Sequence, residues 1–175
     1  MNKFRFLIIV LFVLSCSVGA QAQGTPNLRP YQPSGWSDKI VVSTQTGTNT
    51  DSNPLRTTDT LYLDWAVAND GTASVGISFQ IALYIDGLQK QTWTVSPPMD
   101  ANTYIYVPDY PLGSLNAGIH TIRLLADSAN VVMESNELDN EYSKVITVIA
   151  PPNLTPYHPN YAHNGRDRVK KEGEG

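Results

Sequence analysis

The chain has 175 residues, enough for one domain with tails, and its 41% hydrophobic and 16% charged composition is that of a globular protein. Residues 26–150 hold thirteen acidic and six basic side chains, a net charge of −7 that argues against nucleic acid and anionic lipid as partners. The only cysteine is Cys16, so the chain beyond it has no disulfide, cysteine metal site or cysteine nucleophile.

Residues 1–22 have the pattern of an export signal peptide. Lys3 and Arg5 precede an apolar run at 6–14 that is too short to span a bilayer, and a small-x-small cleavage pattern ends at Ala22. We therefore expect a secreted or cell-surface protein with no membrane span. A second interpretation stays open, because residues 13–16 are similar to a loose lipobox, in which Cys16 would be lipidated and anchor the chain.

The body of the chain opens with extended segments. Three prolines forbid a helix in residues 26–33, and residues 39–43 predict a short edge strand. Residues 44–59 are polar and predict a loop. Residues 61–68 then show the clearest alternation of the chain, with Trp65 as the predicted core anchor.

The remaining strands follow with turn signals between them. A turn is expected at residues 69–71, and Asp86-Gly87 predicts a tight hairpin, because both positions accept a positive φ. Pro108 is expected to end a strand. The count of seven or eight short strands without an amphipathic helix predicts an all-β antiparallel sandwich. The predicted later strands are 79–85, 88–95, 103–107, 121–126 and 145–148.

A repeat appears after the last strand. Residues 152–159 repeat residues 26–33, with Thr155 in place of Arg29 and His158 in place of Gln32. The offset is 126 residues, about one domain, so we interpret residues 150–164 as a linker or the start of an incomplete second copy. A proline-rich linker that matches by chance is the alternative. Residues 165–175 are expected to be a disordered polar tail.

The loop between the last two predicted strands is the main candidate site. Carboxylates are concentrated there, and carboxylate, amide and backbone oxygens are the ligands that calcium prefers. The alternative is structural, since Asp and Asn side chains also bond their own backbone in turns and Glu can accept backbone N–H bonds. No EF-hand spacing is present. The candidate calcium ligands are Asp127, Asn130, Glu134, Glu137, Asp139 and Asn140.

A second candidate site consists of tyrosines on the outward phase of the strands. Tyr62, Tyr104 and Tyr106 are the candidates for stacking on sugar rings. Tyrosine also favours strands for its fit to a pleated surface, which is the structural alternative. No catalytic residues are predicted: the chain lacks Gly-x-Ser-x-Gly and His-Glu-x-x-His, and His120 is interpreted as structural.

Five stretches, in their order and spacing, resemble one family. They are Pro26-Asn27-Leu28, Val-Ala-Asn-Asp-Gly-Thr at 67–72, Leu-Tyr-Ile-Asp-Gly at 83–87, Gly-Ile-His-Thr-Ile at 118–122, and the acidic loop through Glu-Ser-Asn-Glu at 134–137. Together they resemble CARDB, the cell-adhesion-related domain found in bacteria, over residues 26–149. The family usually ends its acidic loop with Glu-x-Asn-Asn, where this chain has Asp139 in the first Asn position.

The resemblance implies an immunoglobulin-like or fibronectin-like sandwich, often in tandem on exported surface proteins, and no reaction. We therefore expect a non-catalytic spacer, adhesion or interaction module, with other surface proteins or polysaccharide as partners. The alternative is a carbohydrate- or ligand-binding accessory module of a larger secreted enzyme. No cofactor is expected, except calcium if the acidic loop binds it.

Overall fold

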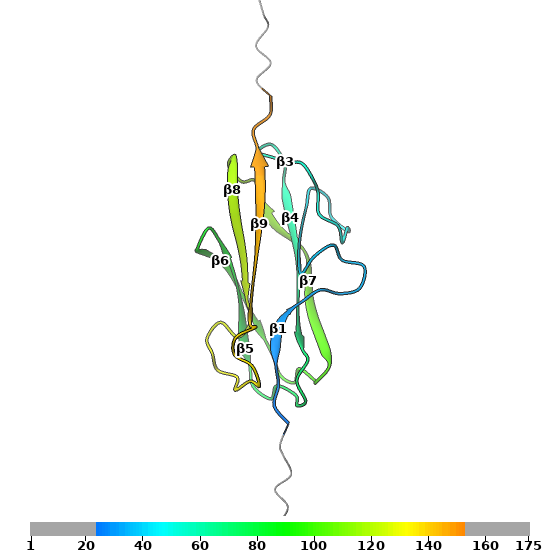
Figure 1. The fold of residues 1–175 in the computed structure, drawn as a ribbon, viewed down its shortest axis with the longest axis vertical. Helices are drawn as coiled ribbons and strands as arrows, with labels where there is room; N and C mark the ends of the chain where they lie inside the picture. The colour runs from blue at the N-terminus through cyan, green and yellow to red at the C-terminus, as the bar shows by residue number, and fades with distance from the viewer. Residues whose placement is uncertain (1–23, 153–175) are drawn as a thin grey trace, which may run out of the picture.

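The computed structural model describes residues 24–152, which form two β-sheets packed face to face (Figure 1). The predicted export signal, Cys16, most of the second repeat and the tail lie outside these residues. Within them the fold is all-β with no helix, which confirms the predicted fold class, and none of their segments is a helix able to cross a membrane. The strands are β1 (Leu28–Tyr31), β2 (Ile40–Ser43), β3 (Leu55–Arg56), β4 (Leu61–Asn69), β5 (Phe79–Ile85), β6 (Leu88–Val95), β7 (Thr103–Gly113), β8 (Gly118–Leu125) and β9 (Glu141–Ile149).

The first sheet is built around β4. One edge of β4 pairs with β7 along its whole length. The other edge is shared, because β1 pairs with residues 66–69 and β2 with residues 62–65. The second sheet has the order β3-β9-β8-β5-β6, and all of its pairs are antiparallel except β3 with β9.

The core lies between the two sheets and confirms Trp65 as its anchor. The Trp65 side chain is 1% exposed, and its ring centroid lies 4.8 Å from that of Trp93 in β6. Alternate residues of β4 face inward against β5 and β8, as the period of two predicts. The inward-facing residues of these three strands are Leu61, Leu63, Trp65, Val67, Phe79, Ile81, Leu83, Ile85, Ile122 and Leu124.

Several strand boundaries differ from the predictions: β8 and β9 begin at Gly118 and Glu141 rather than at residues 121 and 145, and two further differences concern β3 and β7. The predicted loop 44–59 contains the short strand β3, and β7 does not end at Pro108 but continues to Gly113. β7 is an edge strand, and two of its residues, Pro108 and Asp109, bulge opposite the single residue Asp64 of β4. A proline is tolerated at such a place because the missing N–H leaves no ladder bond unmade.

The described chain begins and ends at opposite poles of the sandwich (Figure 1). Residues 24–27 lead into β1 at one pole, and β9 leads out at the other. The hairpin predicted at Asp86-Gly87 connects β5 and β6, with φ values of 52° and 79°.

Candidate functional site

The acidic loop, residues 126–140, connects β8 to β9. Asp127 begins it in a left-handed conformation, with φ of 41°, and its side chain is buried. Its Oδ2 accepts a hydrogen bond from Val132 N at 2.7 Å, and its carbonyl accepts one from Asn130 N at 2.8 Å. Asp127 and Asn130 therefore shape the turn, which is the structural alternative considered for these residues.

Glu134 is the most connected carboxylate of the loop. It is 8% exposed, and its Oε2 accepts a hydrogen bond from Leu28 N at the start of β1. Its Oε1 accepts one from Asn140 Nδ2 at 2.8 Å. The pKa of Glu134 is raised to about 7, chiefly by burial and also by the nearby charges of Glu137 and Asp127, against the lowering effect of these two bonds.

The other two acidic candidates, Glu137 and Asp139, also accept hydrogen bonds near Glu134 and the start of β1. Glu137 Oε1 accepts a hydrogen bond from Glu134 N at 2.9 Å. Asp139 Oδ2 accepts one from Asn27 Nδ2 at 3.3 Å, and the same amide donates to Asp70 Oδ1 at 2.8 Å. The loop thus uses its carboxylates to hold the segment before β1.

Sequence reasoning missed two residues of this arrangement, Asn27 and Asn69. Asn69 Oδ1 accepts a hydrogen bond from Asn27 N at 3.1 Å, while its Nδ2 donates to two backbone carbonyls, those of Ala73 and Met99. The backbone of Ser135 also donates to Pro26 O at 2.9 Å. We call Asn27, Asn69, Glu134 and Ser135 the N-terminal clamp. Both asparagines fall within the stretches that carry the family resemblance, but a sequence does not show that they bond each other.

The structure does not assemble the six predicted calcium ligands into one acidic cluster. Within residues 24–152 no group of three or more His, Cys, Asp or Glu side chains is placed to hold a metal ion. Three buried oxygens of the predicted set nevertheless have no hydrogen-bond partner, namely Oδ1 of Asp127, of Asp139 and of Asn140. Buried acceptors are usually satisfied by protein, water or an ion, so these three are open to a further ligand.

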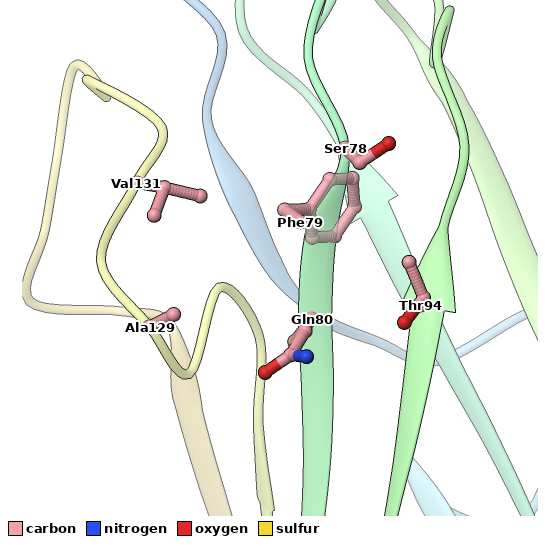
Figure 2. A pocket seen from close by; sticks show the side chains of 6 residues that line it. All are labelled: Ser78, Phe79, Gln80, Thr94, Ala129 and Val131. Carbon is pink, nitrogen blue, oxygen red and sulfur yellow. The ribbon is translucent and has the colours of Figure 1, made fainter.

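A pocket of about 280 Å³ lies beside the acidic loop (Figure 2). It forms where β8 has ended and the loop passes β5, to which it is tied by a bond from Ser128 N to Gln80 O at 2.9 Å. Val131 and Ala129 of the loop face Phe79 and Thr94 across it (Figure 2). The lining contains no ionisable side chain, so this pocket offers no acid, base or metal ligand.

The tyrosine candidates lie on the outer face of the first sheet. Tyr104 and Tyr106 of β7 are 47% and 57% exposed, and their ring centroids are 6.3 Å apart. Tyr62 of β4 is only partly exposed and lies nearer the far end of the strand. Two residues not named as candidates extend the cluster: Tyr31 contacts Tyr104 and Trp36 contacts Tyr106. We call Tyr31, Trp36, Tyr104 and Tyr106 the aromatic face.

His120 is placed as a structural residue. Its Nδ1 lies 2.7 Å from Asp86 Oδ2 in the β5–β6 turn, and its Nε2 lies 2.9 Å from Asn116 O. The bond with Asp86 raises the pKa of His120, as does the bond with Asn116. The ring therefore connects two turns at the pole where β9 ends.

A family model, CARDB, matches residues 40–144, more than half of the chain. Among solved structures, a CARDB domain from Pyrococcus furiosus, determined in complex with di-metal ions, matches with a TM-score of 0.51 at 18% identity, covering 75% of this chain and all of that one. A domain of a candidate cell surface protein from Methanosarcina acetivorans matches with a TM-score of 0.50 at 19% identity, covering 71% of this chain and 93% of that one. No curated protein matches the chain. At these identities the two structures confirm the fold alone.

Proposed function

The chain belongs to the CARDB family, and from that premise we propose that it is a non-catalytic β-sandwich module that spaces or joins parts of an exported surface protein. The observation that carries the proposal is that the described residues begin and end at opposite poles of the sandwich (Figure 1). Such modules, joined end to end, extend along one axis rather than folding back. The relative described as a candidate cell surface protein agrees with this setting.

The N-terminal clamp supports a role in which the ends carry load. A spacer must keep its first strand attached when the preceding segment is pulled, and β1 has only four residues. The clamp adds bonds from the loop at 134–135 and from Asn69, so the first strand is held by side chains from two distant segments. The repeat of Pro-Asn-Leu at 152–154 supplies the same residue types where a following module would begin.

A tandem of two bodies tests the proposal. Two copies of residues 24–152, with the native residues 153–159 between them, would be compared with one copy by small-angle X-ray scattering. An eleven-residue strand such as β7 spans roughly 35–40 Å. We expect the maximum dimension to grow by at least that length. Growth of only a few ångströms would mean that the modules stack side by side, and would contradict a spacer.

We further propose that the acidic loop takes up a divalent cation. The partnerless buried oxygens of Asp127, Asp139 and Asn140 support this, as does the number of carboxylates in the sequence of the loop. The relative determined with di-metal ions is consistent with it. The cation would neutralise like charges that otherwise raise the pKa of Glu134.

A thermal melt of the chain in EDTA and then in millimolar calcium tests the cation. Calcium at about one hundred times its Kd should stabilise the fold by roughly 2.7 kcal/mol and raise the Tm by several degrees. Asp127→Asn should remove most of that rise, whereas Asp100→Asn, outside the loop, should leave it intact. An unchanged Tm across calcium, magnesium and manganese would leave the loop with a purely structural role.

A further inference from the structure

The aromatic face is built by pairing large residues with small ones. On the outer side of β4 lie Ala66 and Ala68, opposite Tyr106 and Tyr104 of β7. Tyr31 of β1 lies opposite Ala66 on the other edge. The two alanines are buried although they belong to the outer phase, and the three tyrosines are their direct cross-strand neighbours. The ring centroids of Tyr31 and Tyr104 are 5.1 Å apart across the central strand.

The ring of Trp36 borders this flat surface on one side as a wall, because it stands at a steep angle to the ring of Tyr106. Its ring stands edge-on to Tyr106, with an interplanar angle of 89° and centroids 6.4 Å apart. The loop that carries it is fixed by a bond from Trp36 N to Pro33 O at 3.1 Å and one from Gln32 Nε2 to Trp36 O at 2.8 Å. A hollow of about 260 Å³ lies between the wall and the strand, lined by Pro33, Ser34, Trp36, Asn49, Tyr104, Tyr106 and Pro108.

The chemistry of the hollow selects one class of ligand. It contains no Asp, Glu, Lys or Arg side chain, so nothing in it compensates a charged ligand. Its polar groups are the exposed side chains of Ser34 and Asn49 and the tyrosine hydroxyls. In the described part of the chain, none of the Ser34, Asn49, Tyr104 or Tyr106 side chains makes a hydrogen bond. Aromatic rings with hydrogen-bonding groups at their rim suit a molecule with apolar faces and a hydroxylated edge.

We propose that the hollow between Trp36 and Tyr106, with the adjoining aromatic face, binds a neutral polysaccharide. A pyranose ring presents C–H groups on its faces and hydroxyls around its edge, which suit the aromatic rings and the polar side chains of the lining. The row from Tyr106 through Tyr104 to Tyr31 continues the surface beyond the hollow, so successive sugar units of one chain have rings to contact. The acidic body disfavours an anionic polymer. This inference goes beyond the spacer proposal and does not depend on it.

The test is retention of the chain, freed of its predicted export signal, on insoluble cellulose, chitin, mannan and xylan in buffer with EDTA. We expect retention on at least one of these. Trp36→Leu and Tyr106→Leu, which keep an apolar side chain but remove the ring, should each weaken binding about tenfold to a hundredfold, the usual loss for one stacking contact.

The control is Tyr62→Leu, on the same sheet but outside the hollow, which should bind as the unchanged chain does. Thermal melts of all variants establish that each is folded before its binding is compared. The proposal is overturned by no retention on any of these neutral polysaccharides, or by retention of the Trp36 and Tyr106 variants equal to that of the unchanged chain. Neither of these outcomes alters the length measured for the tandem, so the two proposals fail separately.

Discussion

At the scale of single residues, Glu134 joins the acidic loop to the start of β1 and to Asn140. Replacement by alanine leaves Leu28 N and Asn140 Nδ2 without their acceptor in a buried place. We expect Glu134→Ala to lower the free energy of unfolding by about 2–4 kcal/mol, because each unsatisfied buried donor costs about 1–3 kcal/mol. Urea denaturation measures the loss.

The matched control for Glu134 is Glu141→Ala. Glu141 is half-exposed and pairs with Arg123 at 2.8 Å, and a pair of that kind contributes at most about 1 kcal/mol. If the two variants lose the same stability, Glu134 does not hold the loop to β1 in solution.

His120 gives a prediction that depends on pH. The bond to Asp86 raises the folded-state pKa of His120 above the ordinary histidine value of 6.5, so the charged pair stabilises the fold below that pH. The stabilisation is lost as the pH rises through the folded pKa. The Tm difference between the unchanged chain and Asp86→Asn should therefore be larger at pH 5.5 than at pH 8.5.

An NMR titration of the His120 ring checks the same pair directly. Its pKa should lie above 6.5 in the unchanged chain and fall in Asp86→Asn. A pKa that is the same in both would show that the 2.7 Å contact is not maintained in solution.

The sequence located the residues of the acidic loop but not what each one does. The four acidic residues of the loop are recognisable in the sequence as a concentration of charge, and turn roles for Asp127 and Asn130 follow from local chemistry. The clamp could not be predicted from the sequence, because Asn27 and Asn69 are 42 residues apart and Glu134 is 106 residues from Leu28. A pattern of one chain carries no distance between such segments. Trp36 was missed for the same reason, since its loop contacts β7 only in the fold.

At the scale of elements, Lys144 connects the two sheets. It lies on β9, and its Nζ contacts Asp38 Oδ2 at 2.9 Å, Asp51 Oδ2 at 2.8 Å and Ile40 O at 2.7 Å. Burial raises the pKa of Asp38, but the hydrogen bonds from Lys144 and Tyr142 outweigh that effect and lower it overall. The ammonium group therefore holds the segment before β2 against the opposite sheet.

We expect Lys144→Met to lower the free energy of unfolding by roughly 2–4 kcal/mol, because it leaves two partly buried carboxylates without their cation. Arg123→Met, which removes a more exposed pair with Glu141, should cost less than about 1 kcal/mol. Chemical denaturation of both variants measures the two losses of the free energy of unfolding. Adding Asp51→Asn to Lys144→Met should recover part of the loss, and the absence of any recovery would contradict the electrostatic cause.

Most strands were predictable because their alternation is local. The inner residues of β4 and the hairpin at Asp86-Gly87 are examples, since period and turn chemistry are properties of neighbouring residues. β3 has two residues and no period to detect, and it pairs with β9, a strand far away in the sequence. β7 passes Pro108 because Asp64 Oδ1 accepts a hydrogen bond from Asp109 N at 2.6 Å in the bulge, a contact between strands that a proline rule does not include.

At the scale of the whole molecule, the poles of the sandwich have different supports. The pole at which the chain begins contains the clamp, where the acidic loop and Asn69 hold the residues before β1. The opposite pole is supported by β3 beside β9 and by the pair of His120 and Asp86. A force that pulls on the two ends is therefore carried first by β1 and its clamp at one pole, and by β9 within its sheet at the other.

This arrangement predicts a difference between mechanical and thermal stability. Asn69→Ala removes bonds to Asn27 and to two carbonyls at the clamp, whereas Lys144→Met acts between the sheets away from it. The two variants would be compared in a polyprotein pulled through its ends, after their free energies of unfolding have been measured. For a similar loss of stability, we expect Asn69→Ala to lower the mean unfolding force more, because its contacts are the first to carry the load. If the mean unfolding force of both variants falls in proportion to their loss of stability, the clamp contributes to folding but not to resistance against pulling. The load would then be carried by the sheets as a whole.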